Sequence, residues 1–149
     1  MTRNALDEFR DAIHRAGLSP PDVIEPDRFH RFPGYGKRNG NTAGWCKLFA
    51  DQRGGIFGDF STGLIESWQA ERSRPWTHAE RQAFREQVER ARGEAEAARR
   101  EEHVKAAERA AAIWNAAKPA PADHPYLARK GVPAHGLRLY RGDLELIRK

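Results

Sequence analysis

The chain opens with apolar residues at helical spacing. They recur every three or four positions, at Leu6, Phe9, Ile13 and Ala16. This spacing places side chains on one face of a helix. Asn4 precedes the run as a capping residue, and Gly17, followed by two prolines, ends it. The pattern predicts a short amphipathic helix between Asn4 and Gly17.

Residues 28–68 follow a different rhythm, in which short runs rich in aromatic and aliphatic residues are separated by turn-forming residues; in the first run, cations alternate with rings. The runs are RFHRF (28–32), WCKLF (45–49), GIFGDF (55–60) and LIESW (64–68). Turn-forming residues separate them, first GYGKRNGN and then DQRGG and STG, with lengths suited to hairpins. We expect three or four antiparallel strands, with the first helix covering one face of their sheet.

From Pro75 to Pro119 the chain consists mainly of Ala, Glu, Arg and Gln. Thr77 and Glu80 have the spacing of a capping box, which predicts that a helix begins here and continues to about residue 118. Large apolar residues are few, so we expect charge pairs and helix propensity, not burial, to stabilise it. The helix is therefore predicted to be an arm outside the core.

The last segment, residues 119–149, contains a second short helical pattern. Asp123 is a candidate cap, Pro125 lies early, and Gly131 ends the pattern. LRLY (137–140) and LELI (144–147) are predicted to pair as a hairpin. The fold class is therefore α+β, in three parts: residues 1–74, 75–118 and 119–149, the last of which could begin a truncated following domain.

Composition excludes several classes of protein. Of 149 residues only 39% are hydrophobic and 32% are charged, which indicates that part of the chain is solvated. One cysteine excludes an internal disulfide framework. No apolar run approaches the roughly 18 residues that cross a membrane, and acidic residues near the amino end argue against a secretory signal. We expect a soluble, cytoplasmic protein without a membrane partner.

The net charge of +5 favours an anionic partner, and its distribution indicates where that partner binds. Residues 28–50 contain no acidic residue. Cations in this window can neutralise phosphates, rings can stack on bases, and glycines can present backbone amides to a phosphate. The window therefore predicts a surface for single-stranded nucleic acid, with the candidate contacts Arg28, Arg31, Tyr35, Lys37, Arg38, Trp45 and Lys47.

A second interpretation of the same window is the core of a small β domain with cations on its other face. Taken singly, the rings expected in such a core are Phe29, Phe32, Trp45 and Phe49. Tyr35 lies between two glycines in a predicted loop and is expected to be exposed. A further alternative for the whole protein is an interaction module that docks a partner through the long helix.

The sequence gives little support for a metal site, a nucleotide-binding loop or a catalytic centre. Cys46 and His30 lack the paired ligands that a structural zinc site needs, so no metal is expected and Cys46 is interpreted as a buried small hydrophobe. GYGKRNGN has Arg38 where a phosphate-binding loop has a hydroxyl after its lysine. No nucleophile motif or pair of catalytic carboxylates is present. We expect no cofactor, and no catalysis by this chain alone.

Several of these segments together resemble a known family. They are FHRF, the glycine-rich turn, GWCKLF, GIFGDFSTGLIESW, and HPYLARKGV followed by GLRLY. Over roughly residues 5–70 and 122–147, the chain is similar to the amino-terminal region of plasmid and phage DNA primases and primase-helicases of the Toprim type. In that family a small β module, zinc-binding in many members, precedes a helical linker and the catalytic Toprim domain.

The resemblance has two departures, because this chain lacks both the zinc ligands and the Toprim motifs. It therefore implies a zinc-ribbon-like module without zinc, acting as an accessory, template-binding region in the replication of a plasmid, phage or other mobile element. The implied partners are single-stranded DNA, or RNA, and a primase or helicase subunit. The implied template contacts are Arg31, Tyr35, Lys37, Arg38 and Trp45. A metal-dependent primase assembled with a separate Toprim chain is a weaker alternative.

Overall fold

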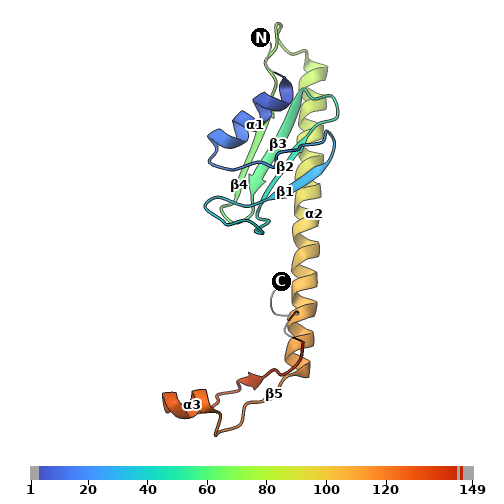
Figure 1. The fold of residues 1–149 in the computed structure, drawn as a ribbon. Helices are drawn as coiled ribbons and strands as arrows, with labels where there is room; N and C mark the ends of the chain where they lie inside the picture. The colour runs from blue at the N-terminus through green and yellow to red at the C-terminus, as the bar shows by residue number, and fades with distance from the viewer. Residues whose placement is uncertain (1–3, 144, 146–149) are drawn as a thin grey trace. The chain divides into compact units, whose positions relative to one another are not determined.

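A computed structural model of the chain describes residues 4–143 and 145. The fold is α+β, as predicted (Figure 1). In chain order the elements are α1 (Ala5–Arg15), β1 (Phe29–Phe32), β2 (Gly44–Leu48), β3 (Gly54–Asp59), β4 (Leu64–Gln69), α2 (His78–Ala116), β5 (Lys118–Pro119), α3 (Pro125–Lys130) and β6 (Arg138–Leu139). The chain divides into two compact units, Met1–Glu96 and Ala97–Lys149.

In the first unit, four antiparallel strands form a sheet in the order β1-β2-β3-β4. The register places Phe29 opposite Lys47, and Cys46 opposite Phe57. Each strand lies within one residue of its predicted bounds, because the turn-forming residues between the strands are local signals of where each strand begins and ends.

Helix α1 covers one face of this sheet, as predicted. Asn4 Oδ1 accepts a hydrogen bond from the Leu6 N–H at 3.3 Å, and Gly17 ends the helix with φ 83°. Phe9 and Ile13 are fully buried. They pack with Leu18, Ile24, Phe32, Cys46, Leu48 and Phe57. This half of the core is the one that the amphipathic pattern of the amino end predicts.

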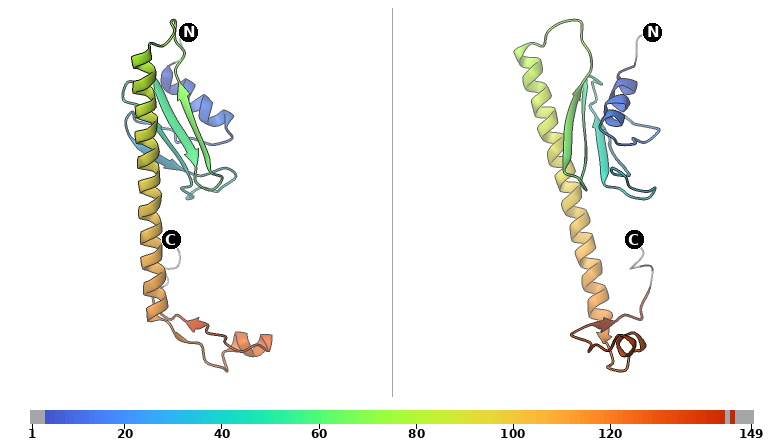
Figure 2. Two further views of the ribbon diagram at one scale, coloured as in Figure 1. Left: turned by 180° about the vertical axis from the view of Figure 1, so that it is seen from behind. Right: turned by 90° about the vertical axis from the view of Figure 1, so that its left-hand side faces the viewer.

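The first part of α2 covers the opposite face of the sheet, so that the unit has three layers (Figure 2). Its buried side chains form a single stripe, at Phe84, Val88, Ala91 and Ala95. The stripe packs on Trp45, Phe49 and Ile56. The prediction that this helix lies outside the core is therefore wrong for residues 84–95. Two of its four buried positions are alanines, which carry little apolar signal in the sequence.

Strand β3 is buried along its whole length, and its glycines explain how two helical layers fit against it. A Cβ at Gly54 would lie 2.5 Å from Phe84 Cε2, and a Cβ at Gly55 would lie 2.6 Å from Phe9 Cε2. The glycines that suggest a turn in the sequence thus admit rings from α2 and α1 directly onto the backbone.

The predicted capping box begins α2. The Thr77 N–H donates to Glu80 Oε2 at 2.9 Å, and the Glu80 N–H donates to Thr77 Oγ1 at 3.2 Å. Hydrogen bonds from Arg74 and from Thr77 lower the pKa of Glu80 well below its ordinary value. None of the helices in the described part of the chain has the length and apolar character needed to cross a bilayer.

In the second unit, α3 begins one residue later than predicted, because His124 and not Asp123 is the cap. His124 Nδ1 accepts from the Tyr126 N–H at 3.3 Å, and Gly131 ends the helix with φ 64° as predicted. Strand β6 pairs with β5, a partner that the sequence did not predict. The predicted partner strand, residues 144–147, lies outside the described residues except for Glu145.

Candidate nucleic-acid interface

The loop between β1 and β2, residues 33–43, contains the most exposed part of the basic window; we call it the basic loop. It includes Lys37 and Arg38 and no acidic residue, and both side chains are exposed. Neither side chain has an ion-pair or hydrogen-bond partner among the residues that the structure describes. Their two positive charges are therefore available to an external anion.

Hydrogen bonds give the basic loop a defined conformation. Asn41 Oδ1 accepts from the Gly34 N–H at 3.1 Å and from the Ala43 N–H at 2.9 Å, which joins the two ends of the loop. The Lys37 N–H donates to Gly34 O at 3.0 Å, and the Asn41 N–H donates to Arg38 O at 3.1 Å. The two cations are thus carried on consecutive turns.

Asp59, at the end of β3, holds the base of the loop. Its side chain accepts hydrogen bonds from the Tyr35 N–H at 2.7 Å, the Ser61 N–H at 2.7 Å and Ser61 Oγ at 2.6 Å. A Cβ at Gly34 would lie 2.9 Å from both Asp59 carboxylate oxygens, so only glycine allows this approach. Burial would raise the pKa of Asp59, but these hydrogen bonds lower it below its ordinary value.

Asp59 is a positioning residue that was not identified from the sequence. A usable signal was present, since an aspartate followed two residues later by serine is typical of a side-chain-capped turn. The aspartate's partner across the sheet, Tyr35, is separated from it by 24 residues, and sequence spacing does not show that contact.

A cleft of about 550 Å³ lies between the basic loop and residues 17–22; we call it the basic cleft. Arg31 and Lys37 line it together with Gly34 and Gly36. Its one carboxylate, Asp22, lies 4.0 Å from the Arg10 guanidinium, which partly balances its charge. The cleft therefore has a net positive lining, to which a phosphate would be attracted.

Tyr35 is 63% exposed, as predicted for a ring between two glycines. Its ring lies against the backbone at Gly17, where a Cβ would be 2.9 Å from Tyr35 Cε2. The exposed face of this ring is available for stacking, beside the two free cations of the basic loop.

Arg31 and Arg28 have partners within the chain. The Arg31 Nε–H donates to Thr42 O at 2.7 Å, and its guanidinium lies 4.9 Å from the centre of the Phe60 ring. Arg28 pairs with Glu25. Arg31 is thus fixed at the rim of the basic cleft, whereas the charge of Arg28 is already compensated.

Two of the predicted contacts require correction. Trp45 is fully buried, with its ring 5.6 Å from that of Phe29 and 5.8 Å from that of Phe60, so it cannot stack on a base. The Lys47 side chain is only 12% exposed and pairs with Glu94 at 2.8 Å and Asp27 at 3.3 Å. Partial burial would lower the pKa of Lys47, but these two carboxylates raise it above its ordinary value.

The physical reason for both corrections is α2, which covers the aromatic rings of this sheet face and supplies Glu94. The candidate surface is therefore the basic loop at the end of the sheet and not the sheet face itself. Tyr35, Lys37 and Arg38 form its exposed part, and Arg31 lies beside them.

The residues considered for zinc are engaged elsewhere. Cys46 is buried in the core, as predicted, and burial raises the pKa of its thiol to about 12. His30 Nε2 accepts from the Glu25 N–H at 3.0 Å. Within residues 4–143 and 145, no group of three or more His, Cys, Asp or Glu side chains could hold a metal ion.

Comparison with known proteins does not assign the chain to a family. No protein-family model, no curated protein and no solved structure matches it.

Proposed function

We propose that the first unit binds single-stranded nucleic acid through the basic loop, as an accessory module in the replication of a plasmid or phage. The observation that carries the proposal is the pair of uncompensated cations, Lys37 and Arg38, on a hydrogen-bonded glycine-rich loop. Exposed Tyr35 and the basic cleft adjoin them. The primase-like segments of the sequence support the replication context and a cytoplasmic location.

In this mechanism Lys37 and Arg38 neutralise phosphates, while Tyr35 stacks on a base. Arg31, fixed at the rim of the basic cleft, offers a further positive charge with little loss of side-chain entropy. Asp59 acts indirectly by holding the loop in place. The proposal contains no catalytic step, and RNA could replace DNA because neither contact depends on the sugar.

The test is binding of a fluorescent oligothymidylate, measured by anisotropy over a range of salt concentrations. The double variant Lys37→Ala/Arg38→Ala should weaken binding at every concentration. It should also reduce the slope of log affinity against log salt by about 1.4, because each phosphate contact to a single strand contributes roughly 0.7.

The matched control is Arg85→Ala/Arg90→Ala, which removes two exposed cations from α2 of the same unit. It should leave the slope close to that of the unaltered protein. Loss of binding in this control, with retention in the loop variant, would contradict the proposal and favour α2 as the interaction surface. Absence of binding at low salt would contradict it outright.

A further inference from the structure

Strand β4 forms one edge of the sheet, and its outer side has no strand partner among the described residues. The Ala70 N–H donates to Arg53 O at 3.0 Å, which identifies Ala70 and alternate residues before it as those bonded to β3. Ile65, Ser67 and Gln69 therefore direct their N–H and C=O groups outward, and all three residues are exposed. Such an edge can accept another strand.

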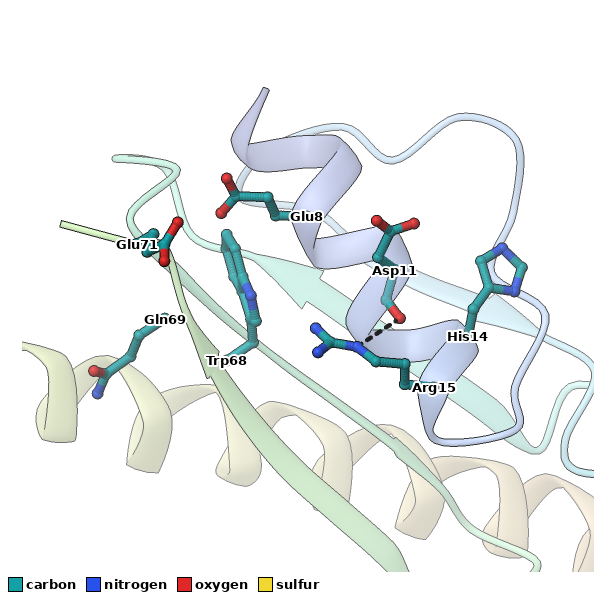
Figure 3. A pocket seen from close by; sticks show the side chains of 7 residues that line it. All are labelled: Glu8, Asp11, His14, Arg15, Trp68, Gln69 and Glu71. Carbon is teal, nitrogen blue, oxygen red and sulfur yellow. Dashed lines mark hydrogen bonds between the residues drawn. The ribbon is translucent and has the colours of Figure 1, made fainter. Parts of the chain in front are cut away.

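A groove runs between this edge and α1 (Figure 3). Its larger part has a volume of about 700 Å³ and is lined by Glu8, Asp11, His14 and Arg15 of α1 and by Trp68, Gln69 and Glu71. A further cavity of about 330 Å³ shares Arg15 and Trp68 with it and adds Glu66. None of these residues belongs to the basic loop or the basic cleft.

Trp68 provides an apolar floor for the groove. Its half-buried ring lies 5.3 Å from the ring of Phe9, which anchors it against the core. On the other face of the same strand, the Ile65 side chain is 46% exposed. An added strand would thus find an apolar contact on each side of β4.

The charge of the groove restricts what can occupy it. Its carboxylates are Glu8, Asp11, Glu66 and Glu71, against a single arginine, Arg15. Glu8 and Glu71 form no ion pair with any residue that the structure describes. This acidic lining contrasts with the net charge of +5 of the whole chain.

We propose that the β4 edge docks an extended, basic segment of a partner protein, which adds a fifth strand beside β4 and places lysine or arginine side chains in the acidic groove. Strand addition supplies main-chain hydrogen bonds, and alternate side chains supply specificity. A second copy of this chain is disfavoured at this edge, because two β4 strands would bring two acidic grooves together.

The geometry also defines the pattern of the partner segment. Alternate side chains of an added strand point to opposite faces of the sheet. Those on the α1 face would meet Glu66, Glu8 and Glu71, and those on the α2 face would meet Ile65. The segment should therefore alternate cationic with aliphatic residues over the length of β4, about six positions.

The test uses a capped peptide of about eight residues that alternates lysine with valine. Isothermal titration calorimetry gives its affinity for the full chain, and NMR gives the residues whose amides shift. Binding should shift the amides of Ser67 and Gln69 and leave those of Lys37 and Arg38 unchanged. A peptide that alternates glutamate with valine should not bind.

Two variants test the two parts of the proposal. Ser67→Pro removes an outward N–H and should weaken the lysine–valine peptide about tenfold or more. Glu8→Lys/Glu71→Lys should weaken it similarly through charge, whereas the control Glu86→Lys/Glu96→Lys on α2 should not. A peptide with N-methylated valines gives the same test of main-chain pairing without altering the protein, so it remains decisive if Ser67→Pro does not fold.

Equal binding of the N-methylated and unmodified peptides would overturn the proposal, because main-chain pairing would then have no part in it. Equal effects of the groove and control charge reversals would also overturn it. So would the absence of binding, or dimerisation of the unaltered protein through β4.

Discussion

At the scale of single residues, Asp59 links the core to the candidate surface. It is almost completely buried at the end of β3, yet its carboxylate reaches the backbone of the basic loop at Tyr35 and the following turn at Ser61. These hydrogen bonds offset the unfavourable free energy of burying the carboxylate, because hydrogen bonds to a charged acceptor are stronger than those to a neutral one. Asp59 therefore connects the loop that carries the cations to the buried end of β3, and it acts together with the Asn41 hydrogen bonds that join the two ends of the loop.

Replacing Asp59 tests this role. Asp59→Asn should lower the free energy of unfolding by about 1–3 kcal/mol at neutral pH, because an amide nitrogen then faces N–H donors. Asp51→Asn, at an exposed carboxylate that bonds only the Arg53 N–H among the described residues, is the control and should change it little. Chemical denaturation measures both.

The pH dependence of this difference has a definite sign. The pKa of Asp59 is lowered by folding, so its charged form stabilises the protein above the pKa of the unfolded chain, and this contribution is lost as pH falls through the folded-state value. The gap between the unaltered protein and Asp59→Asn should therefore narrow below about pH 4. A gap that stays constant down to acidic pH would contradict the assignment.

Tyr35 differs from the cations in the kind of contact that we expect it to make. Tyr35→Ala should weaken single-strand binding by roughly 1–3 kcal/mol, the usual contribution of one stacked base, without changing the salt slope. Tyr35→Phe keeps the ring and should bind nearly as the unaltered protein does. Anisotropy titrations at two salt concentrations distinguish these outcomes, and a change of slope in Tyr35→Ala would argue against stacking.

At the scale of elements, β3 and α2 depend on one another through small residues. The glycines of β3 admit Phe84 of α2 on one face and Phe9 of α1 on the other. The buried stripe of α2 begins at Phe84 and continues four, seven and eleven residues later, at Val88, Ala91 and Ala95. The layers therefore meet where aromatic rings of the two helices pack directly on the glycine backbone of β3.

Alanine substitutions at two glycines test this packing with opposite expected signs. Gly55→Ala should destabilise the protein by about 1–3 kcal/mol, because its Cβ would meet the Phe9 ring. Gly93→Ala, in α2 with open space around it, should stabilise the protein by up to about 1 kcal/mol. Thermal and urea unfolding measure the stability of both variants. An unchanged stability of Gly55→Ala would show that the layers can move apart without loss of stability.

At the scale of the whole molecule, the core of the first unit requires residues beyond the sheet. Phe84 and Val88 together contribute roughly 3–6 kcal/mol of burial, a large part of the 5–15 kcal/mol that stabilises a typical domain. The ion pair between Lys47 and Glu94 also depends on this part of α2.

Truncation tests this dependence. A chain of residues 1–96 should unfold cooperatively and retain single-strand binding, because it keeps the full stripe on α2. A chain of residues 1–76 exposes Phe49 and Ile56 and should lose cooperative unfolding. Circular dichroism and the oligothymidylate assay compare them. A cooperative 1–76 chain of unchanged stability would show that α2 is dispensable to the core.

Much of the fold was predictable because its signals are local. Asn4 and Gly17 mark the ends of α1, Thr77 and Glu80 mark the start of α2, and hairpin-length turns determine the order of the four strands. The exposure of Tyr35 and the burial of Cys46 were predictable for the same reason, since each follows from its immediate neighbours. The pairing of β6 with β5 was not predictable, because β5 contains only two residues and one of them is proline.

The sequence by itself therefore determined the types of element, the hairpin topology and the presence of a basic, glycine-rich loop, all of which depend on residues close in the chain. Only the tertiary structure decided which cations and rings remain available. Helix α2 covers Trp45 and pairs with Lys47 through Glu94, so neither side chain is available to a ligand. This helix begins some 30 residues later in the chain, and its alanine-rich stripe gives little hydrophobic signal in the sequence. Burial depends on the sum of contacts from distant segments, and periodicity within one segment does not record them.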